Sequence, residues 1–152
     1  MTSEFTIAVH ALVFLHHNGG LCSSEGLAEN ICTNPARIRK IMAKLKKAGI
    51  VDTKEGIEGG YHYVDNPQEL SLYKVAKALD FDFVSCGWKS GNEEKRCVIC
   101  SGMRTVMDEL YEELNKACYE KLKNVTVCDF DRYLFKGQMF KDDNIDFDKI
   151  DE

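Results

Sequence analysis

The sequence from Asn34 to Gly49 is NPARIRKIMAKLKKAG. Asparagine is a strong N-cap residue, proline suits the first helical position, and glycine suits the position just after the last turn. The stretch therefore predicts a helix with both ends marked. Its apolar residues recur at helical spacing and predict one face that packs into a core: Ile38, Ile41, Met42 and Leu45.

The same helix carries six basic residues and no acidic one, in a protein whose net charge is −5. Four of them fall on one face and the other two beside it: Arg37, Lys40, Lys44 and Lys47, then Arg39 and Lys46. A face that is merely solvated more often mixes both signs. Because phosphate binding depends on the local patch, the acidic total does not exclude nucleic acid as a partner.

Short elements flank the basic helix on both sides. Before it, Ser23 or Ser24 caps a short helix that ends near Asn30, which predicts a helix-turn-helix arrangement. After it, two β-rich runs, 50–54 and 61–64, are separated by a glycine-containing turn. These runs predict a hairpin that serves as a wing.

The remaining segments complete the core and add an arm. An apolar helix is expected over residues 5–17, and Ser71 can cap another helix that closes the core. A long helix follows the loop after that, and residues 124–135 are expected to pack back on the body. Apolar residues in the long helix step by four and three, which is typical of a coiled-coil seam: Met103, Met107, Leu110, Leu114 and Ala117.

We therefore expect a mainly α fold with a small β-hairpin, a winged helix-turn-helix with a long C-terminal dimerisation helix. The expected divisions are a DNA-binding domain over 1–80, a cysteine-containing loop over 81–100, a dimerisation helix and packing segment over 101–140, and an acidic tail over 141–152. No apolar run approaches the roughly 20 residues of a membrane span, and no signal peptide is recognisable. The expected location is the cytoplasm.

Seven cysteines are too many for a structural disulfide set in that compartment, and their odd number leaves one unpaired. Cys86 lies in the expected loop, with Cys97 and Cys100 at its far edge. A C-x-x-C pair suits zinc, iron–sulfur and redox chemistry alike. A metal cluster, a thiol switch and no chemistry at all remain open. The other four are expected to be small buried or boundary residues: Cys22, Cys32, Cys118 and Cys128.

Several motifs resemble the Rrf2 family of bacterial winged-helix transcription regulators, over about residues 5–130. They are the run from Leu45 to Val51, then Gly56-x-x-Gly59-Gly60-Tyr61, a turn at Pro67, and Leu72-x-x-Val75-x-x-Ala78-Leu79. The resemblance implies a homodimer with a long crossing helix. It also implies a loop that in some members carries three cysteines binding an iron–sulfur cluster, whereas other members sense thiol oxidation or a partner protein.

The sequence departs from the family pattern in two places. Glu55 stands before the first wing glycine, where many members have an arginine, so Lys54 is the nearest cation. The middle cysteine is missing, because ten residues separate Cys86 from Cys97. Cys100 falls where some members have a histidine ligand, and a fourth ligand would be Glu4, His10 or an exogenous group.

The expected function is a DNA-binding transcription regulator, most often a repressor, that binds a near-palindromic operator as a homodimer. It would sense iron–sulfur or redox status through Cys86, Cys97 and Cys100. The alternative is a thiol redox or protein-interaction module that no longer binds DNA. An enzyme is not expected, because no Ser/His/Asp set, paired carboxylates or phosphate loop occurs.

The predicted contacts to double-stranded DNA come from the helix-turn-helix and the wing. Arg37, Arg39 and Lys40, near the helix start, are candidates for base edges, and Lys44 and Lys47 for phosphates. The full set is Ser24, Thr33, Asn34, Arg37, Arg39, Lys40, Lys44, Lys47, Thr53, Lys54, Gly59, Gly60 and His62.

Overall fold

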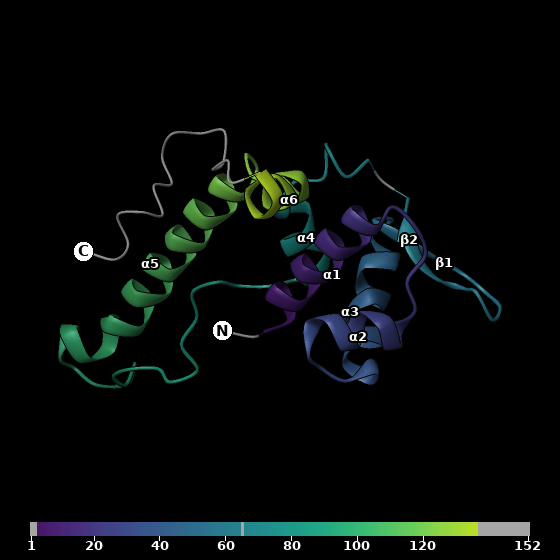
Figure 1. Cartoon of the computed structure of the whole chain (residues 1–152). Helices are drawn as coiled ribbons and strands as arrows, with labels where there is room; N and C mark the ends of the chain where they lie inside the picture. The colour runs from purple at the N-terminus through teal and green to yellow at the C-terminus, as the bar shows by residue number, and fades with distance from the viewer. Residues whose placement is uncertain (1–2, 65, 137–152) are drawn as a thin grey trace.

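The computed structural model describes residues 3–64 and 66–136. Within them the fold is mainly helical with one antiparallel hairpin, as the sequence predicts (Figure 1). In chain order the elements are α1 (Glu4–Asn18), α2 (Ser24–Ile31), α3 (Pro35–Lys47), β1 (Val51–Lys54), β2 (Gly60–Tyr63), α4 (Leu72–Leu79), α5 (Val98–Leu122) and α6 (Val127–Lys136).

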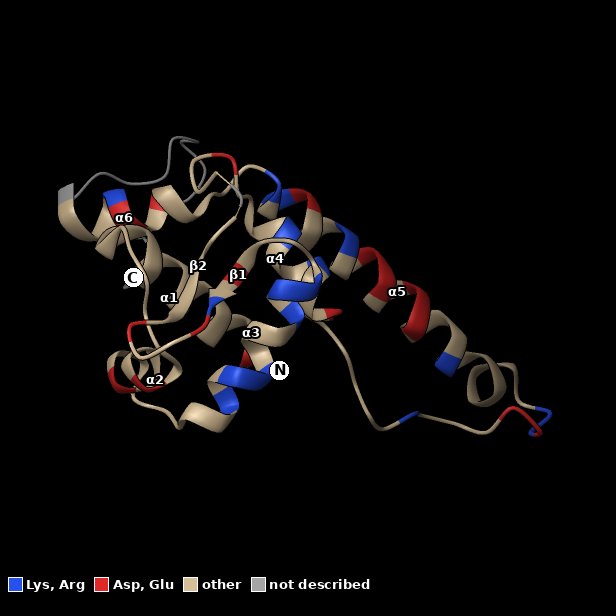
Figure 2. Ribbon diagram, turned by 90° about the vertical axis from the view of Figure 1, so that its right-hand side faces the viewer, with Lys and Arg blue, Asp and Glu red and all other residues tan. Residues whose placement is uncertain are grey.

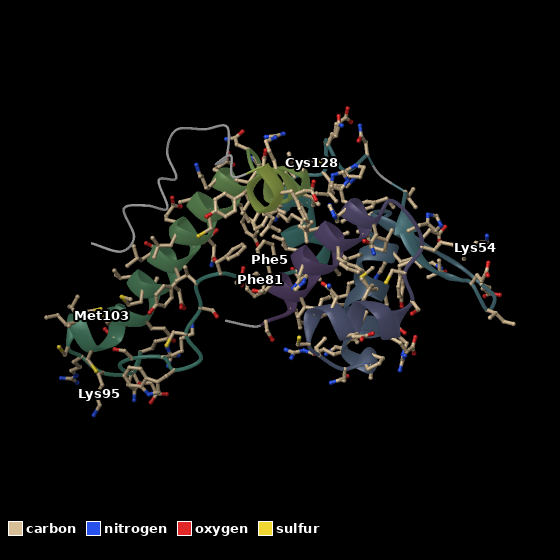
Figure 3. The ribbon with its side chains drawn as sticks, viewed as in Figure 1. Phe5, Lys54, Phe81, Lys95, Met103 and Cys128 are labelled. Carbon is tan, nitrogen blue, oxygen red and sulfur yellow. The ribbon has the colours of Figure 1, made fainter. Side chains whose placement is uncertain are left out.

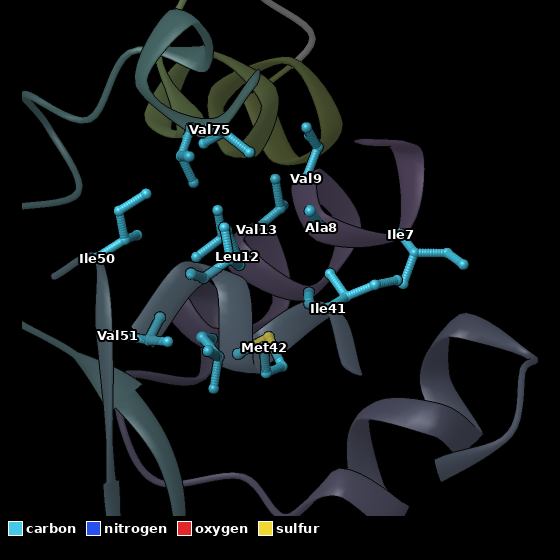
Figure 4. Close-up of a cluster of buried hydrophobic side chains, with 14 of the residues drawn as sticks. Ile7, Ala8, Val9, Leu12, Val13, Ile41, Met42, Ile50, Val51 and Val75 are labelled. Atoms are coloured by element: carbon cyan, nitrogen blue, oxygen red, sulfur yellow. The ribbon is translucent and has the colours of Figure 1, made fainter. Parts of the chain in front are cut away.

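Helix α1 runs through the centre of the body and packs against α2, α3, α4 and α6 (Figure 1). The predicted apolar stripe of α3 meets it in the core, where all four side chains are fully buried (Figure 4): Ile38, Ile41, Met42 and Leu45. Burial of such a side chain contributes about 2 kcal/mol. The basic helix is therefore fixed in orientation by its apolar side.

Side-chain caps set the helix ends at the predicted places. The Asn34 side chain accepts a hydrogen bond from the backbone N–H of Arg37 at 2.9 Å, and Gly49 takes a positive φ of 74° just beyond α3. Of the two serines proposed for α2, Ser23 is the cap. Ser71 caps α4. Each cap satisfies a backbone N–H that has no partner inside its own helix.

The hairpin pairs β1 with β2 in a register that places Lys54 opposite Gly60. Gly60 lies so close to the segment before α2 that an added Cβ would sit 2.4 Å from the carbonyl oxygen of Cys22. Cys22 and Tyr61 exchange two backbone hydrogen bonds, of 3.2 and 2.8 Å. The wing is thereby tied to the helix-turn-helix.

The arm differs from its expected boundary. Helix α5 begins at Val98, inside the expected loop 81–100, and extends away from the body (Figures 1 and 2). Its N-cap is Cys97, whose side chain makes no capping hydrogen bond, so the sequence has no conventional start signal there. Cys100 consequently lies in the first turn of the helix. The predicted acidic tail 141–152 falls outside the described residues.

Among the described residues, no helix combines the length and the apolar character needed to cross a membrane.

Candidate nucleic-acid interface

The outward face of α3 is a line of four exposed residues. Since successive helical residues turn by about 100°, the line opposite the buried stripe consists of Ala36, Lys40, Ala43 and Lys47. Because the two alanine side chains are small, another molecule can approach the helix backbone closely along this line. The two lysines supply positive charge on the same line.

One flank of this line is held by the start of α1. The Arg37 guanidinium donates to Ser3 Oγ. Lys44 Nζ lies 2.6 Å from Glu4 Oε2 and Lys40 Nζ lies 3.6 Å from Glu4 Oε1. The hydrogen bond from Lys44 is the largest of the effects that hold the pKa of Glu4 below its usual value.

The other flank is held by α2 and the wing. Arg39 Nη1 donates to Ser24 Oγ at 3.1 Å and to Glu25 Oε1 at 3.3 Å. Lys46 Nζ donates to Thr53 Oγ1 at 2.7 Å and lies 3.2 Å from an Asp52 carboxylate oxygen. These groups are exposed, so the contacts orient the cations rather than stabilise the fold.

Hydrogen bonds from the neighbouring backbone lower the pKa values of two of these acids. The pKa of Glu25 is lowered by a bond from its own backbone N–H and then by Ser24. The pKa of Asp52 is lowered by the Thr53 backbone N–H and then by Lys46. Both groups are therefore ionised at neutral pH.

The turn residues among the predicted contacts also have structural roles. The side-chain oxygen of Asn34 is occupied as the α3 cap. Thr33 is half-buried, and its N–H closes the turn onto Ala28 O at 3.0 Å. These two residues shape the turn between α2 and α3.

The wing presents Lys54, exposed, at the point where β1 enters the turn (Figure 3). An added Cβ on Gly59 would sit 2.1 Å from the Lys54 carbonyl oxygen, so the tight turn needs glycine there. His62 is half-buried, with Nδ1 3.0 Å from its neighbour's carbonyl oxygen. The tip carries the fully exposed Ile57, followed directly by Glu58, with Glu55 two residues before it. Positive charge therefore gathers on α3 more than on the wing tip (Figure 2).

Sequence reasoning missed the residues that hold the basic face, because their contacts span distant parts of the chain. They are Ser3, Glu4, Glu25 and Asp52. It also missed the exposed Ala36 and Ala43, although a helical wheel of α3 would have placed both on the outward line.

The three cysteines predicted as metal ligands are not brought together. Val84 is bonded through both its N–H and its carbonyl to the side chain of Asn115, at 2.9 and 2.8 Å, and Lys89 pairs with Asp108. Cys86, between these anchors, lines a groove beside Asp108 and Asn115. Cys97 and Cys100 lie at the start of α5, and Asp108, the first residue of that helix that lines the groove, is about 12 Å beyond Cys100 along the helix axis at 1.5 Å per residue.

Within residues 3–64 and 66–136, no group of three or more His, Cys, Asp or Glu side chains could hold a metal ion. The two proposed protein sources of a fourth ligand are engaged elsewhere. Glu4 holds two lysines, and His10 Nε2 lies 2.9 Å from Asn30 Oδ1. In this arrangement the residues do not fit an iron–sulfur cluster.

The other four cysteines occupy different environments. Cys22, Cys118 and Cys128 are partly exposed, as expected of boundary residues, and burial raises the pKa of the Cys22 and Cys128 thiols. Cys32 is exposed, contrary to the expectation, because it forms the C-cap of α2 with a positive φ of 60°.

Comparison with known proteins identifies the fold and the family. The model of the Rrf2 family, described as an iron-dependent transcriptional regulator, matches residues 1–131. The HTH-type transcriptional regulator YwnA of Bacillus subtilis is 26% identical, over 89% of this chain and 99% of its own. IscR of Photobacterium profundum, also an HTH-type transcriptional regulator, is 24% identical over 95% of this chain and 77% of its own.

Solved structures share the fold. T. potens IscR matches with a TM-score of 0.66 and 20% identity, covering 93% of each chain. CymR, the global cysteine regulator of B. subtilis, matches with a TM-score of 0.63 and 18% identity, over 88% of this chain and 96% of its own. The capped basic helix, the wing and the family match agree, and the chain belongs to the Rrf2 family of winged-helix, DNA-binding transcription regulators.

Proposed function

We propose that the protein is a cytoplasmic repressor that binds a near-palindromic operator as a homodimer, with α3 in the major groove. The observation that carries this proposal is the outward line of α3, in which exposed lysines alternate with alanines between two flanks of oriented cations. A helix of this shape fits the major groove, which admits one α-helix.

The roles follow from position along α3. Arg37, Arg39 and Lys40 lie near the end that enters the groove first and would read base edges. Lys44, Lys47 and Lys54 would bind phosphates. The remaining proposed contacts are polar residues that would form hydrogen bonds to the DNA backbone and glycines that would let the DNA backbone approach closely: Ser24, Thr33, Asn34, Thr53 and His62, then Gly59 and Gly60.

The dimer would form through α5. Its exposed apolar residues form a stripe on the side of the helix away from Asp108 and Asn115: Ile99, Met103, Val106, Leu110 and Leu114. Antiparallel pairing of two such stripes would place the N-terminal end of each α5 beside the C-terminal end of the other, which adjoins the body; this end is called the root of α5. An apolar groove between α1 and α6, lined by Phe5, Val9 and Leu134, lies at that root.

Removal of the two cations nearest the start of α3 tests the reading helix. Arg37→Ala with Lys40→Ala should abolish retention of genomic operator fragments in a gel-shift assay, while Lys95→Ala with Lys121→Ala, which removes equal charge away from α3, should retain them. Specific retention by the first variant would refute the helix assignment. Failure of the wild type to bind any fragment would favour the protein-interaction alternative.

For sensing, we propose that the cysteine loop reports redox or iron–sulfur status to α5. The geometry supports the Cys97 and Cys100 pair, one turn apart at the helix start, as the responsive unit. A cluster would require Cys86 to leave its groove. The visible spectrum of anaerobically purified protein separates the two readings, because iron–sulfur charge transfer absorbs near roughly 400 nm. A colourless protein whose two thiols are lost on peroxide treatment, with peroxide as the two-electron oxidant, would support the thiol pair.

A further inference from the structure

The start of α1 covers one flank of the helix that reads DNA. Ser3 accepts from Arg37, and Glu4 lies between Lys40 and Lys44. These three cations follow one another along α3 at intervals of three and four residues, so two consecutive residues of α1 engage a whole edge of the basic face.

Glu4 presents its two carboxylate oxygens to the two lysines separately. Oε2 is 2.6 Å from Lys44 Nζ and Oε1 is 3.6 Å from Lys40 Nζ. A phosphate group offers the same chemistry, namely two anionic oxygens in reach of two ammonium groups. The first turn of α1 also favours a negative charge at this position, because the helix N-terminus carries partial positive charge.

Packing holds Glu4 in place. Its side chain is 23% exposed, and the next residue, Phe5, stacks on Phe81 with ring centroids 5.8 Å apart and meets Phe83 edge-on at 5.1 Å. Phe81 and Phe83 precede Val84, which Asn115 of α5 grips through two hydrogen bonds. The carboxylate is therefore linked through an aromatic contact to the segment that enters the cysteine loop.

We propose that Glu4 is an internal competitor for DNA phosphate at Lys40 and Lys44, held in place by the contact of Phe5 with Phe81 and Phe83. The inference rests on the proposed function, in which Lys40 and Lys44 contact DNA. When DNA binds, a phosphate replaces the carboxylate at these ammonium groups. The protein thus binds its operator less tightly than its cations alone would allow, and movement of the 81–84 segment changes that affinity.

The test compares Glu4→Gln with Glu69→Gln, which makes the same charge change in the turn before α4. Affinity for a selected operator duplex is measured by fluorescence anisotropy across a series of salt concentrations. Glu4→Gln should bind about two- to fivefold more tightly than wild type at low salt. Its plot of log K against log salt should keep the slope of wild type, because the slope follows the number of phosphates contacted and both proteins contact the same ones. Glu69→Gln should match wild type in both affinity and slope.

A second pair of variants separates competition from a general gain of positive charge. In a Lys40→Ala, Lys44→Ala background, Glu4→Gln should change affinity by less than about twofold. Phe83→Ala should mimic Glu4→Gln in part, because it loosens the support of Phe5.

An unchanged or weaker affinity of Glu4→Gln, with wild-type binding intact, would overturn the competition alone. A gain that persists without the two lysines would also overturn it. If wild type and both glutamine variants fail to bind DNA, the proposed DNA contacts fail instead.

Discussion

Helices α3 and α5 both expose a distinctive face, but only the face of α3 is supported within its own chain. On α3, neighbouring elements hold the cations of both flanks, through Ser3 and Glu4 on one side and Glu25 and Asp52 on the other. On α5, the described part of the chain leaves Val106, Leu110 and Leu114 between 42% and 60% exposed.

This difference between α3 and α5 indicates that one chain can form the DNA-reading surface, whereas covering the apolar stripe of α5 needs a second surface. The cations on the flank of α2 and the wing are oriented before DNA arrives, so little ordering of their side chains remains to be done on binding, whereas Lys40 and Lys44 first exchange Glu4 for phosphate. An exposed apolar stripe of this length is stabilised only when another surface covers it. We therefore expect the reading surface to be intact in a monomer, whereas the spacing of two reading surfaces depends on α5.

The largest effect is expected on dimerisation. Leu110→Glu would place a charge inside the paired stripe, where desolvation is costly, and should weaken the dimer more than about 100-fold. Thr105→Glu, which adds the same charge on another side of α5, should leave the dimer intact. Sedimentation velocity measures both, and circular dichroism of Leu110→Glu should show unchanged helix content. A Leu110→Glu protein that stays dimeric would place the interface elsewhere.

The next largest effect concerns the outward line of α3. Ala43→Glu adds a carboxylate where the phosphates would approach, so operator affinity should fall about 100-fold through like-charge repulsion. Ala43→Gln, which is similar in size but neutral, should lose much less. The free energy of unfolding of both variants should lie within about 0.5 kcal/mol of the wild-type value, because the position is exposed. Full DNA binding by Ala43→Glu would show that DNA approaches another side of the helix.

The wing gives a smaller, structural effect. A Cβ at Gly60 would collide with the backbone of Cys22, at 2.4 Å from its carbonyl oxygen, so Gly60→Ala should destabilise the protein by about 2 kcal/mol. Thermal melting should shift by roughly 4–8 °C. Gly20→Ala is the matched control, because its nearest contact would be 3.9 Å. Equal melting temperatures for the two variants would contradict the close wing contact.

The smallest expected effect is the pH dependence of the Glu4 contact. Since Lys44 lowers the pKa of Glu4 below its usual 4.5, the ionised form favours folding. This stabilisation is fully present above the unfolded pKa and is lost as pH falls through the lower, folded value. In urea unfolding at neutral pH, the free energy of unfolding of wild type should exceed that of Glu4→Gln by about 0.5 kcal/mol. The two free energies should become equal in acid, below the pKa of Glu4 in the folded protein. A difference that is independent of pH would exclude the ionic contact.

Local signals in the sequence predicted most of the fold. The Asn34 cap, the Gly49 turn and the four-residue apolar stripe placed α3, and the glycines placed the wing, because each depends only on near neighbours in the chain. The start of α5 was misplaced because Val98 follows a cysteine rather than a conventional cap residue.

The site was harder to predict because its decisive contacts are tertiary. Nothing in the periodicity of α3 indicates that Lys44 donates a hydrogen bond to Glu4, which lies forty residues earlier in the chain. Likewise, cysteine spacing could not show that Asn115 holds Val84, and with it Cys86, beside the middle of α5 rather than at its start.

One chain forms the reading surface, and we expect two chains to read the operator. Native mass spectrometry of the complex formed with duplexes selected from a random pool measures how many chains bind each duplex. We expect two chains per duplex, with the selected sequence showing two related half-sites about one helical turn, roughly 34 Å, apart. A single chain bound with full affinity to an asymmetric site would contradict the proposed two-chain reading of the operator.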